Sequence, residues 1–235
     1  SIGLKRNLAC YFASGLIIAH FDDDDMYGSC YLEDMVRCLR NPREAFVLLQ
    51  EPEGPKHGAK QKMLEALGMP TEQDVGDAHK LMERAQVRSI LGAFGAACAK
   101  LSSWHTYSLQ TRGWTHFDTL QGANQRSVSD CQVYGWGFSM VYLKASWAVC
   151  PFLHMGLGED LEFVQSLRQL GMPVVLVPDD RGICAHTLHV ENTAISCSKH
   201  DRTGGSTYLM YCPISPLLAI YERTAAGLLA VQGQQ

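Results

Sequence analysis

The stretch LIIAHFDDDD, residues 16–25, decides how this chain is interpreted. Its first six residues form a short, mostly apolar run with β-branched side chains, which is typical of a strand buried on both faces of a sheet. The run ends abruptly in four consecutive aspartates. Because open α/β sheets bind ligands at the carboxyl ends of their strands, the aspartates stand where a ligand site is expected.

Helical patterns flank this strand on both sides. Before it, apolar residues recur at helical spacing up to Gly15, which is a stop signal; they are Leu4, Leu8, Tyr11 and Phe12. After it, Ser29 is a candidate cap of a second helix with Glu33 and Asp34 in its first turns. The apolar stripe of this helix is Tyr31, Leu32, Met35, Val36 and Leu39. Pro42 ends the helix, and residues 45–49 are a further predicted strand, so the order indicates an α/β fold.

The middle of the chain interrupts this alternation. Residues 51–58 are turn-rich, and an apolar stripe at helical spacing follows, made of Ile90, Phe94, Ala97, Cys98 and Leu101. We therefore expect a helical insertion at about 51–102. Strands are predicted again at 104–109, 115–119, 135–142 and 174–177, with a helix around Phe163 and Leu167 that Gly171 closes and a C-terminal helix after Pro213. The whole chain, 1–235, is expected to form a single domain.

Composition excludes several classes of protein. Of the 235 residues, 46% are apolar, so a sizeable core is available. The 20 basic and 24 acidic residues leave no basic excess, which argues against a nucleic-acid partner. No apolar run approaches the ~20 residues of a transmembrane segment. The nine scattered cysteines favour reduced thiols and hence a cytoplasmic location over a disulfide scaffold.

The four aspartates suggest a cation site. Like charges this close repel one another unless solvent or a cation relieves the repulsion. Oxygen ligands suit Mg2+ and Mn2+, which often share phosphate oxygens. A divalent cation bridging aspartates to a phosphate or diphosphate is one interpretation, and a solvated acidic turn is the other. The position at the end of a buried strand favours the cation.

A second acidic pair, Glu159 and Asp160, lies in the first turn of a predicted helix. The helix dipole stabilises negative charge there, so a carboxylate is expected to stay ionised near neutral pH, as a general base requires. Ordinary acidity of a helix start explains the pair equally well. The two acidic sites together are the more specific signal.

Several segments resemble the family-two nucleotide-sugar glycosyltransferases of the GT-A fold. Those enzymes have an R-N pair on a helix, A-x-G before a hydrophobic strand, D-x-D-D, a small-residue acceptor strand, an E-D motif and a late H-x-x-N-[ST] segment. The matching residues here are 5–9 (KRNLA), 13–25 (ASGLIIAHFDDDD), 136–142 (WGFSMVY), 158–160 (GED) and 186–193 (HTLHVENT). The resemblance implies a GT-A-like mixed sheet flanked by helices.

The resemblance also implies roles for individual residues. Asp22 and Asp24 would hold Mn2+ or Mg2+ and the diphosphate and ribose of a nucleotide-sugar donor, with Asp25 as a further metal ligand. The donor-binding residues would be Lys5, Arg6, Asp22 and Asp23. His189 would complete the metal site or contact the diphosphate, with His186 as the alternative; a buried structural histidine explains either one equally well. Asp160 would be the general base, preceded by Glu159.

The implied reaction is inverting, metal-dependent sugar transfer to an acceptor hydroxyl of a glycan, lipid or protein. The β-α-β-α-β stretch that begins these enzymes does not precede Ser1, so we expect a truncated GT-A domain. The Q-x-x-R-W motif of processive members is absent, which indicates a non-processive enzyme. Two alternatives stay open, a non-catalytic sugar- or nucleotide-binding module and a metal-dependent phosphoryl-transfer enzyme. Trp104, Trp114 and Trp136 are candidates for stacking on a sugar or for the core.

Overall fold

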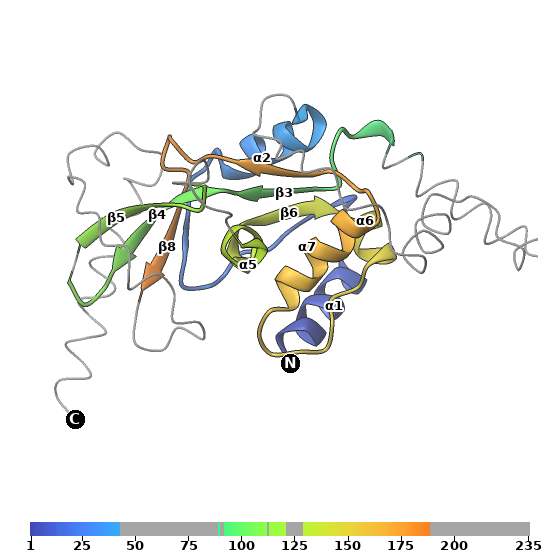
Figure 1. Ribbon diagram of the computed structural model, residues 1–235, viewed down its shortest axis with the longest axis horizontal. Helices are drawn as coiled ribbons and strands as arrows, with labels where there is room; N and C mark the ends of the chain where they lie inside the picture. The colour runs from blue at the N-terminus through green and yellow to red at the C-terminus, as the bar shows by residue number, and fades with distance from the viewer. Residues whose placement is uncertain (43–88, 90–91, 112, 121–128, 189–235) are drawn as a thin grey trace, which may run out of the picture.

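The computed structural model describes residues 1–42, 92–111, 113–120 and 129–188, together with residue 89 (Figure 1). These residues form a mixed α/β structure. Its elements, in chain order, are α1 (Ile2–Phe12), β1 (Ile17–Ala19), β2 (Met26–Tyr27), α2 (Tyr31–Arg40), β3 (Cys98–Leu101), β4 (Ser103–Ser108), β5 (Gly113–Asp118), α5 (Asp130–Tyr134), the 3-10 helix η2 (Gly137–Ser139), β6 (Met140–Leu143), α6 (Lys144–Val149), α7 (Glu159–Gln169), β7 (Val174–Val177) and β8 (Cys184–Leu188).

The described strands form two four-stranded sheets. The first has the order β1-β6-β3-β7, in which β6 runs antiparallel to β1 and β3, and β7 runs parallel to β3. The second has the order β2-β8-β4-β5. Only Ser102 separates β3 from β4, so the chain passes directly from one sheet to the other, as the green ribbon in Figure 1 shows. The coarse prediction of an α/β fold is confirmed.

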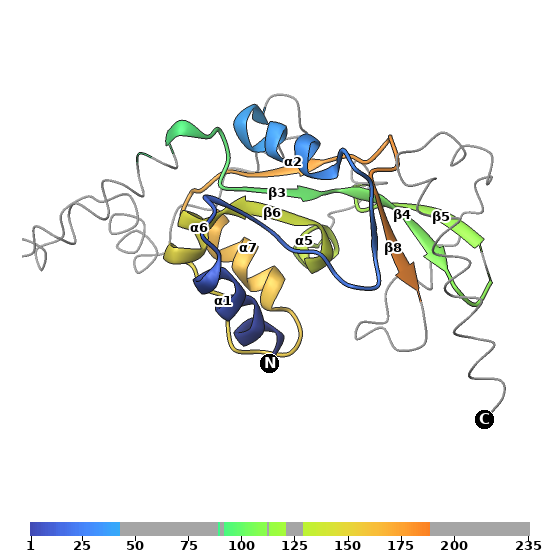
Figure 2. The ribbon, with the colours of Figure 1, turned by 180° about the vertical axis from the view of Figure 1, so that it is seen from behind.

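Helices cover both faces of the first sheet. In Figures 1 and 2, α2 lies on the side of the sheet opposite to α1 and α7. The strand β7 illustrates why this arrangement is stable, because alternate residues of a strand point to opposite faces. Val174 and Leu176 belong to the core on the α7 side, and Val175 and Val177 belong to the core on the α2 side.

The strand at residues 16–21 is shorter and less buried than predicted. Its regular part is Ile17–Ala19, and only Ile18 is buried. The reason is its position, because among the described strands β1 pairs with β6 alone and forms an edge of the sheet. It still delivers the four aspartates to the end of the first sheet, where the chain turns into β2.

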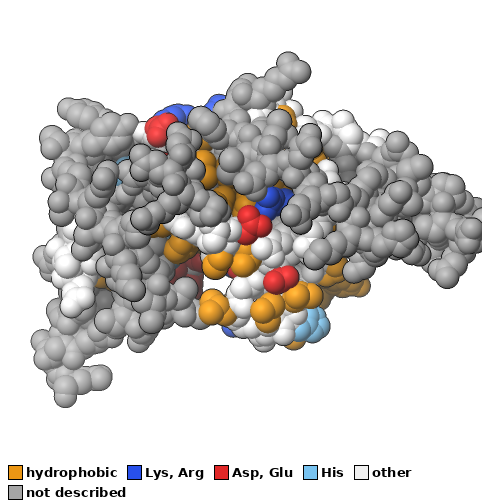
Figure 3. Space-filling model, viewed as in Figure 1, with side chains coloured by type: hydrophobic (Ala, Val, Ile, Leu, Met, Phe, Trp, Pro, Cys, Tyr) orange, Lys and Arg blue, Asp and Glu red, His pale blue; other side chains and the backbone are white. Residues whose placement is uncertain are grey.

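The first helix is present, but its apolar stripe faces outward. Leu4, Leu8, Tyr11 and Phe12 are exposed, and the buried residues of α1 are Gly3 and Cys10. A Cβ atom on Gly3 would stand only 1.8 Å from the carbonyl oxygen of Leu153, so a glycine is what lets α1 approach the loop before α7. Apolar side chains accordingly gather on the lower part of the molecule, where α1 and this loop lie (Figure 3).

The predicted helical insertion needs a correction. Residues 98–101, assigned to a helical stripe, form β3, which lies between β6 and β7 in the first sheet. A short apolar run does not distinguish a buried strand from a helix, and pairing with two neighbouring strands decided the outcome. Residues 51–88, the predicted strand at 45–49 and the predicted C-terminal helix lie outside the described residues.

Most other predicted elements are confirmed. They are the second helix, the strands at 104–109, 115–119 and 174–177, and the helix that ends before Gly171, whose φ is +70°. Two details differ. The second helix has Cys30 rather than Ser29 at its cap, and the strand predicted from residue 135 begins at Met140, after a 3-10 turn. Within the described part of the chain, no helix has the length and apolar character needed to cross a bilayer.

Candidate functional site

The four aspartates form the turn between β1 and β2. Asp22, Asp24 and Asp25 each offer a carboxylate oxygen, and these three oxygens lie within 4.8 Å of one another. Asp23 is exposed. Backbone contacts shape the turn, because the amide of Asp25 donates to the carbonyl of Asp22 at 3.3 Å. The turn therefore directs three of the four carboxylates toward a common point.

Tyr27 ties this turn to the first sheet. The amide of Asp22 donates to the Tyr27 hydroxyl at 3.1 Å, and that hydroxyl donates to the carbonyl of Phe138 at 2.8 Å. Phe138 belongs to the 3-10 turn directly before β6. Asp22 is thus fixed relative to the 3-10 turn that leads into β6, the strand that pairs with β1.

Asp25 is anchored from the second sheet. Its side chain is fully buried, one of its oxygens lies 2.9 Å from Nδ1 of His186, and the same oxygen accepts the amide of Thr187 at 2.8 Å. The His186 ring also stacks on Phe138, with centroids 4.8 Å apart. His186, the alternative to His189 in the sequence analysis, therefore lies at the aspartate cluster. His189 lies outside the described residues.

The electrostatics of the cluster suit a cation. Burial raises the pKa of the Asp22 carboxyl, and the negative charges of Asp25 and Asp24 raise it further, against the opposing effects of Arg6 and His186. The charges of Asp24 and Asp25 thus make Asp22 harder to ionise, and a divalent cation would relieve that repulsion. Three carboxylate oxygens are hard ligands of the kind that Mn2+ and Mg2+ accept, so the residues present fit the expected metal.

The second acidic pair begins α7, as predicted. Gly158 caps this helix in the left-handed region, with φ +83°. Glu159 is only 4% exposed, and its Oε1 lies 3.1 Å from Nε of Arg6. Burial raises the pKa of Glu159, although Arg6 opposes the shift. Burial therefore works against the ionisation that the helix start and Arg6 favour, and a carboxylate that is ionised near neutral pH stays a prediction for this pair.

Asp160 meets Arg6 at Gly137. A Cβ atom on Gly137 would stand 3.1 Å from Oδ2 of Asp160 and 2.6 Å from Nη2 of Arg6. Nη1 of Arg6 also lies 3.3 Å from the carbonyl oxygen of Gly137, to which it donates. Asp160 is 7% exposed, and its carboxylate has no hydrogen-bond partner among the described residues. The helices α1 and α7 and the turn before β6 therefore meet around one nearly buried carboxylate.

Lys100 is the residue that the sequence analysis missed. It lies on β3, is fully buried, and donates from Nζ to the carbonyl of Trp136. Burial lowers its pKa to about 8, and the charges of Asp160 and Asp22 oppose that shift. A lysine within the otherwise apolar run 96–101 was the available signal, but it is informative only once the run is recognised as a central strand.

Arg6 and Lys100 link the two acidic sites. Arg6 opposes the rise that burial causes in the pKa of both Asp22 and Glu159, and Lys100 is affected by both Asp22 and Asp160. Asp24 and Asp25 add further negative charge beside Asp22, so acidic side chains outnumber these two basic ones among the described residues of the two sites. The excess of negative charge is a second reason to expect a bound cation.

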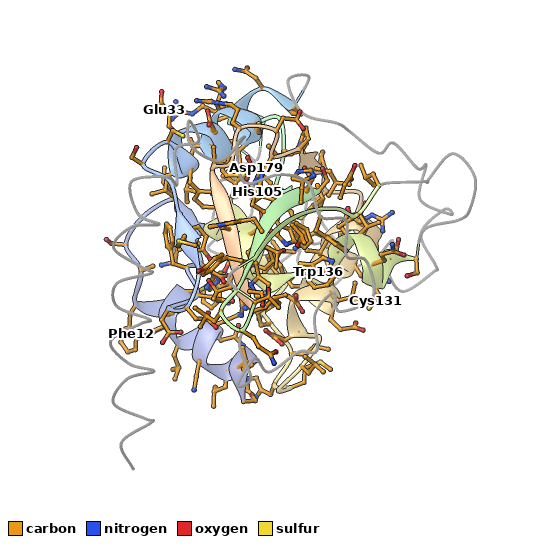
Figure 4. All side chains as sticks on the ribbon, turned by 90° about the vertical axis from the view of Figure 1, so that its left-hand side faces the viewer. Phe12, Glu33, His105, Cys131, Trp136 and Asp179 are labelled. Atoms are coloured by element: carbon orange, nitrogen blue, oxygen red, sulfur yellow. The ribbon has the colours of Figure 1, made fainter. Side chains whose placement is uncertain are left out.

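The remaining predicted residues have different positions. Lys5 is exposed, whereas Arg6 points inward, since neighbours on a helix face different directions. Asn7 holds the loop before α7, because its side chain donates to the carbonyl of Phe152 at 2.8 Å and accepts the Phe152 amide at 2.9 Å. Trp104 is a core residue, and half-buried Trp136, labelled in Figure 4, packs against it with ring centroids 5.1 Å apart. Half-buried Trp114 packs on Tyr107.

No model of a known protein family matches the chain, and no curated protein matches it.

Proposed function

We propose that the chain is a metal-dependent glycosyltransferase of the GT-A type that transfers a sugar from a nucleotide-diphosphate donor to an acceptor hydroxyl, with inversion and without processivity. The observation that supports it best is the pairing of two acidic sites through Arg6 and Lys100. One site, at Asp22, Asp24 and Asp25, has the ligand chemistry of a divalent cation. The other contains Asp160, a nearly buried carboxylate without a hydrogen-bond partner among the described residues.

In this proposal the aspartate turn binds the donor. Asp22 and Asp24 hold Mn2+ or Mg2+ next to the diphosphate, and Asp25 is fixed beside them by His186 and Thr187. When bound, the cation offsets the negative charge that develops on the leaving diphosphate. Lys5 and Asp23, both exposed, are available to the nucleotide part of the donor. Arg6 lies between the two sites and favours negative charge in both.

Asp160 is the proposed base. As the acceptor oxygen forms its bond to the anomeric carbon, the bond from that carbon to the diphosphate breaks, and the acceptor proton passes to the Asp160 carboxylate. A base must keep a lone pair for the incoming hydroxyl, which fits a carboxylate that accepts no hydrogen bond from the described residues. The acceptor itself, a hydroxyl of a glycan, lipid or protein, is part of the proposal only as a chemical class.

The test is donor-dependent release of nucleoside diphosphate by the purified 235-residue chain with Mn2+ and a panel of nucleotide sugars. Asp160→Asn is expected to abolish release while donor binding, measured by calorimetry, survives. Glu162→Gln is the matched control, because it removes a carboxylate from the same first turn of α7 and is expected to keep turnover.

The outcomes separate the alternatives. Donor binding without release of any nucleotide would indicate a non-catalytic binding module. Release of nucleoside monophosphate without sugar transfer would indicate a phosphoryl-transfer enzyme. Equal turnover of Asp160→Asn and the unmodified chain would reject Asp160 as the base.

A further inference from the structure

Lys100 occupies a position where a charge is costly. It is fully buried in the middle of the first sheet, in register with Met140 of β6 and Leu176 of β7. Its neighbours on β3, Ala99 and Leu101, are fully buried apolar residues. Placing an ammonium group in such a core costs free energy that an apolar side chain of similar length would avoid. A packing role alone therefore does not explain a lysine here.

The surroundings of the Lys100 amine all belong to the proposed site. Nζ donates to the carbonyl of Trp136, and the next carbonyl along the chain, that of Gly137, accepts from Arg6. Two cations thus hold two consecutive carbonyls of one turn. The charged and titratable groups that act on Lys100 are Asp160 of α7, Arg6 of α1, Asp22 after β1 and the thiol of Cys98 on its own strand.

The turn held in this way is the one against which Asp160 rests. Oδ2 of Asp160 lies 3.1 Å from the point where a Cβ of Gly137 would stand, so a shift of this turn changes the space around the carboxylate. Lys100 is also a described cation, besides Arg6, on which the charge of Asp160 acts.

We propose that Lys100 is a positioning residue for Asp160, which holds the Trp136–Gly137 turn in place and provides the positive charge opposite the base. This inference rests on the proposed function, because it assigns Lys100 a part in the proton transfer to Asp160. It does not require Lys100 to touch either substrate.

Lys100→Met tests the inference, since methionine is unbranched and of similar length but has no charge and no donor. The expected result is a fall in kcat of roughly 10- to 100-fold, the range that a small displacement of a reacting group produces. KM for the donor is expected to stay unchanged, because Lys100 makes no hydrogen bond or ion pair with the described residues proposed to bind the metal and the donor. The urea midpoint of unfolding is expected not to fall, because methionine removes the cost of a buried ammonium group. Lys144→Met is the matched control, because Lys144 also donates to a backbone carbonyl, that of Ala13, but lies on α6.

Each outcome has a consequence. If kcat and the urea midpoint fall together, Lys100 is a structural residue and the inference is overturned. If kcat is unchanged, the inference is overturned although the proposed function stands. If the unmodified chain releases no nucleoside diphosphate, the proposed function fails and the inference with it. Should Lys100→Met not fold, Lys100→Gln, which keeps a donor but not the charge, is expected to show the same fall in kcat at unchanged KM.

Discussion

Nε of Arg6 lies 3.1 Å from Oε1 of Glu159, so the first helix of the chain is ion-paired with the helix start that contains the proposed base. Both side chains are nearly buried, with exposed fractions of 11% and 5%. The ion pair brings Arg6 and Asn7 of α1 close to Glu159 and Asp160 of α7, although most of the described chain separates these segments in sequence. It also makes Arg6 the residue that both acidic sites share.

Removing Arg6 should therefore be costly. Arg6→Met is expected to lower the free energy of unfolding by about 3–5 kcal/mol, because it leaves Glu159 as an uncompensated buried charge. Urea unfolding at pH 7 measures this loss. Arg6→Met combined with Glu159→Gln should recover part of it, and a double variant no more stable than Arg6→Met would contradict the pairing.

Arg181→Met is the control for that measurement. Arg181 is 60% exposed and shares Asp34 with Arg37, so Asp34 keeps an ionic partner when Arg181 is removed. Exposed ion pairs contribute about 0–1 kcal/mol, and the expected loss is within that range.

The aspartate turn gives a second prediction. Asp24→Asn should weaken Mn2+ binding at least tenfold in calorimetry, because it replaces one of three converging carboxylates by a neutral amide. Asp23→Asn is the matched control, since Asp23 is the adjacent, exposed aspartate outside the converging set, and it should bind Mn2+ as the unmodified chain does. Equal affinity in all three proteins would leave only a solvated acidic turn.

The sequence predicted best those features that depend on local signals. The helix at Glu159–Gln169 and the strand Val174–Val177 have clear periodicity and a glycine stop between them, so both are confirmed. The turn of aspartates follows the first strand as expected. The local pattern did not show that Arg6 and Asn7 have different roles. In the structure Arg6 pairs with Glu159 at the acidic sites, and Asn7 binds the backbone of Phe152 in the loop before α7.

The features that depend on tertiary pairing were not predictable in the same way. Cys98, Ala99 and Leu101 are apolar at positions that suit either period, and only the pairing with β6 and β7 makes residues 98–101 a central strand. The role of Lys100 was missed for that reason. The apolar spacing in α1 predicted the helix but not its packing, because its buried residues are Gly3 and Cys10, and Gly3 lies against the loop at Leu153 where a side chain would not fit.

His20 gives a prediction about pH. Its Nε2 lies 2.6 Å from the Tyr142 hydroxyl, and burial, aided by the charge of Arg6, lowers the His20 pKa to about 3. The unfolded chain binds a proton at His20 below about pH 6.5 and the folded chain does not, so folding stability falls as the pH falls through that range. His20→Gln should remove this contribution, on the order of 1–2 kcal/mol between pH 6.5 and 5.

Urea titrations of both proteins at pH 7, 6 and 5 measure the difference. The urea midpoint of the unmodified chain should fall more steeply with pH than that of His20→Gln. His154→Gln is the control, because His154 is exposed, and it should keep the pH dependence of the unmodified chain. Parallel curves for His20→Gln and the unmodified chain would show that His20 is protonated in the folded protein.

Gly137 provides the sharpest test of the geometry around Asp160. The backbone of Gly137 is not in the left-handed region, so alanine is compatible with its conformation. An added Cβ would nevertheless stand 2.6 Å from Nη2 of Arg6 and 3.1 Å from Oδ2 of Asp160, which is closer than these atoms tolerate. Both atoms are at the ends of side chains, so they can move, and the protein is expected to fold with a loss of stability of about 1 kcal/mol or less.

The movement itself is what should impair the proposed reaction. Gly137→Ala displaces Arg6 and Asp160 from their positions beside residue 137, and a displacement of about 1 Å at a reacting group lowers turnover by up to about 100-fold. Gly156→Ala is the matched control, because nothing lies within 4 Å of the added atom in the loop just before α7, and turnover should be retained. Circular dichroism establishes that both variants fold, and release of nucleoside diphosphate measures turnover. If Gly137→Ala turns over as fast as Gly156→Ala, the arrangement of Arg6 and Asp160 around Gly137 has no part in the reaction.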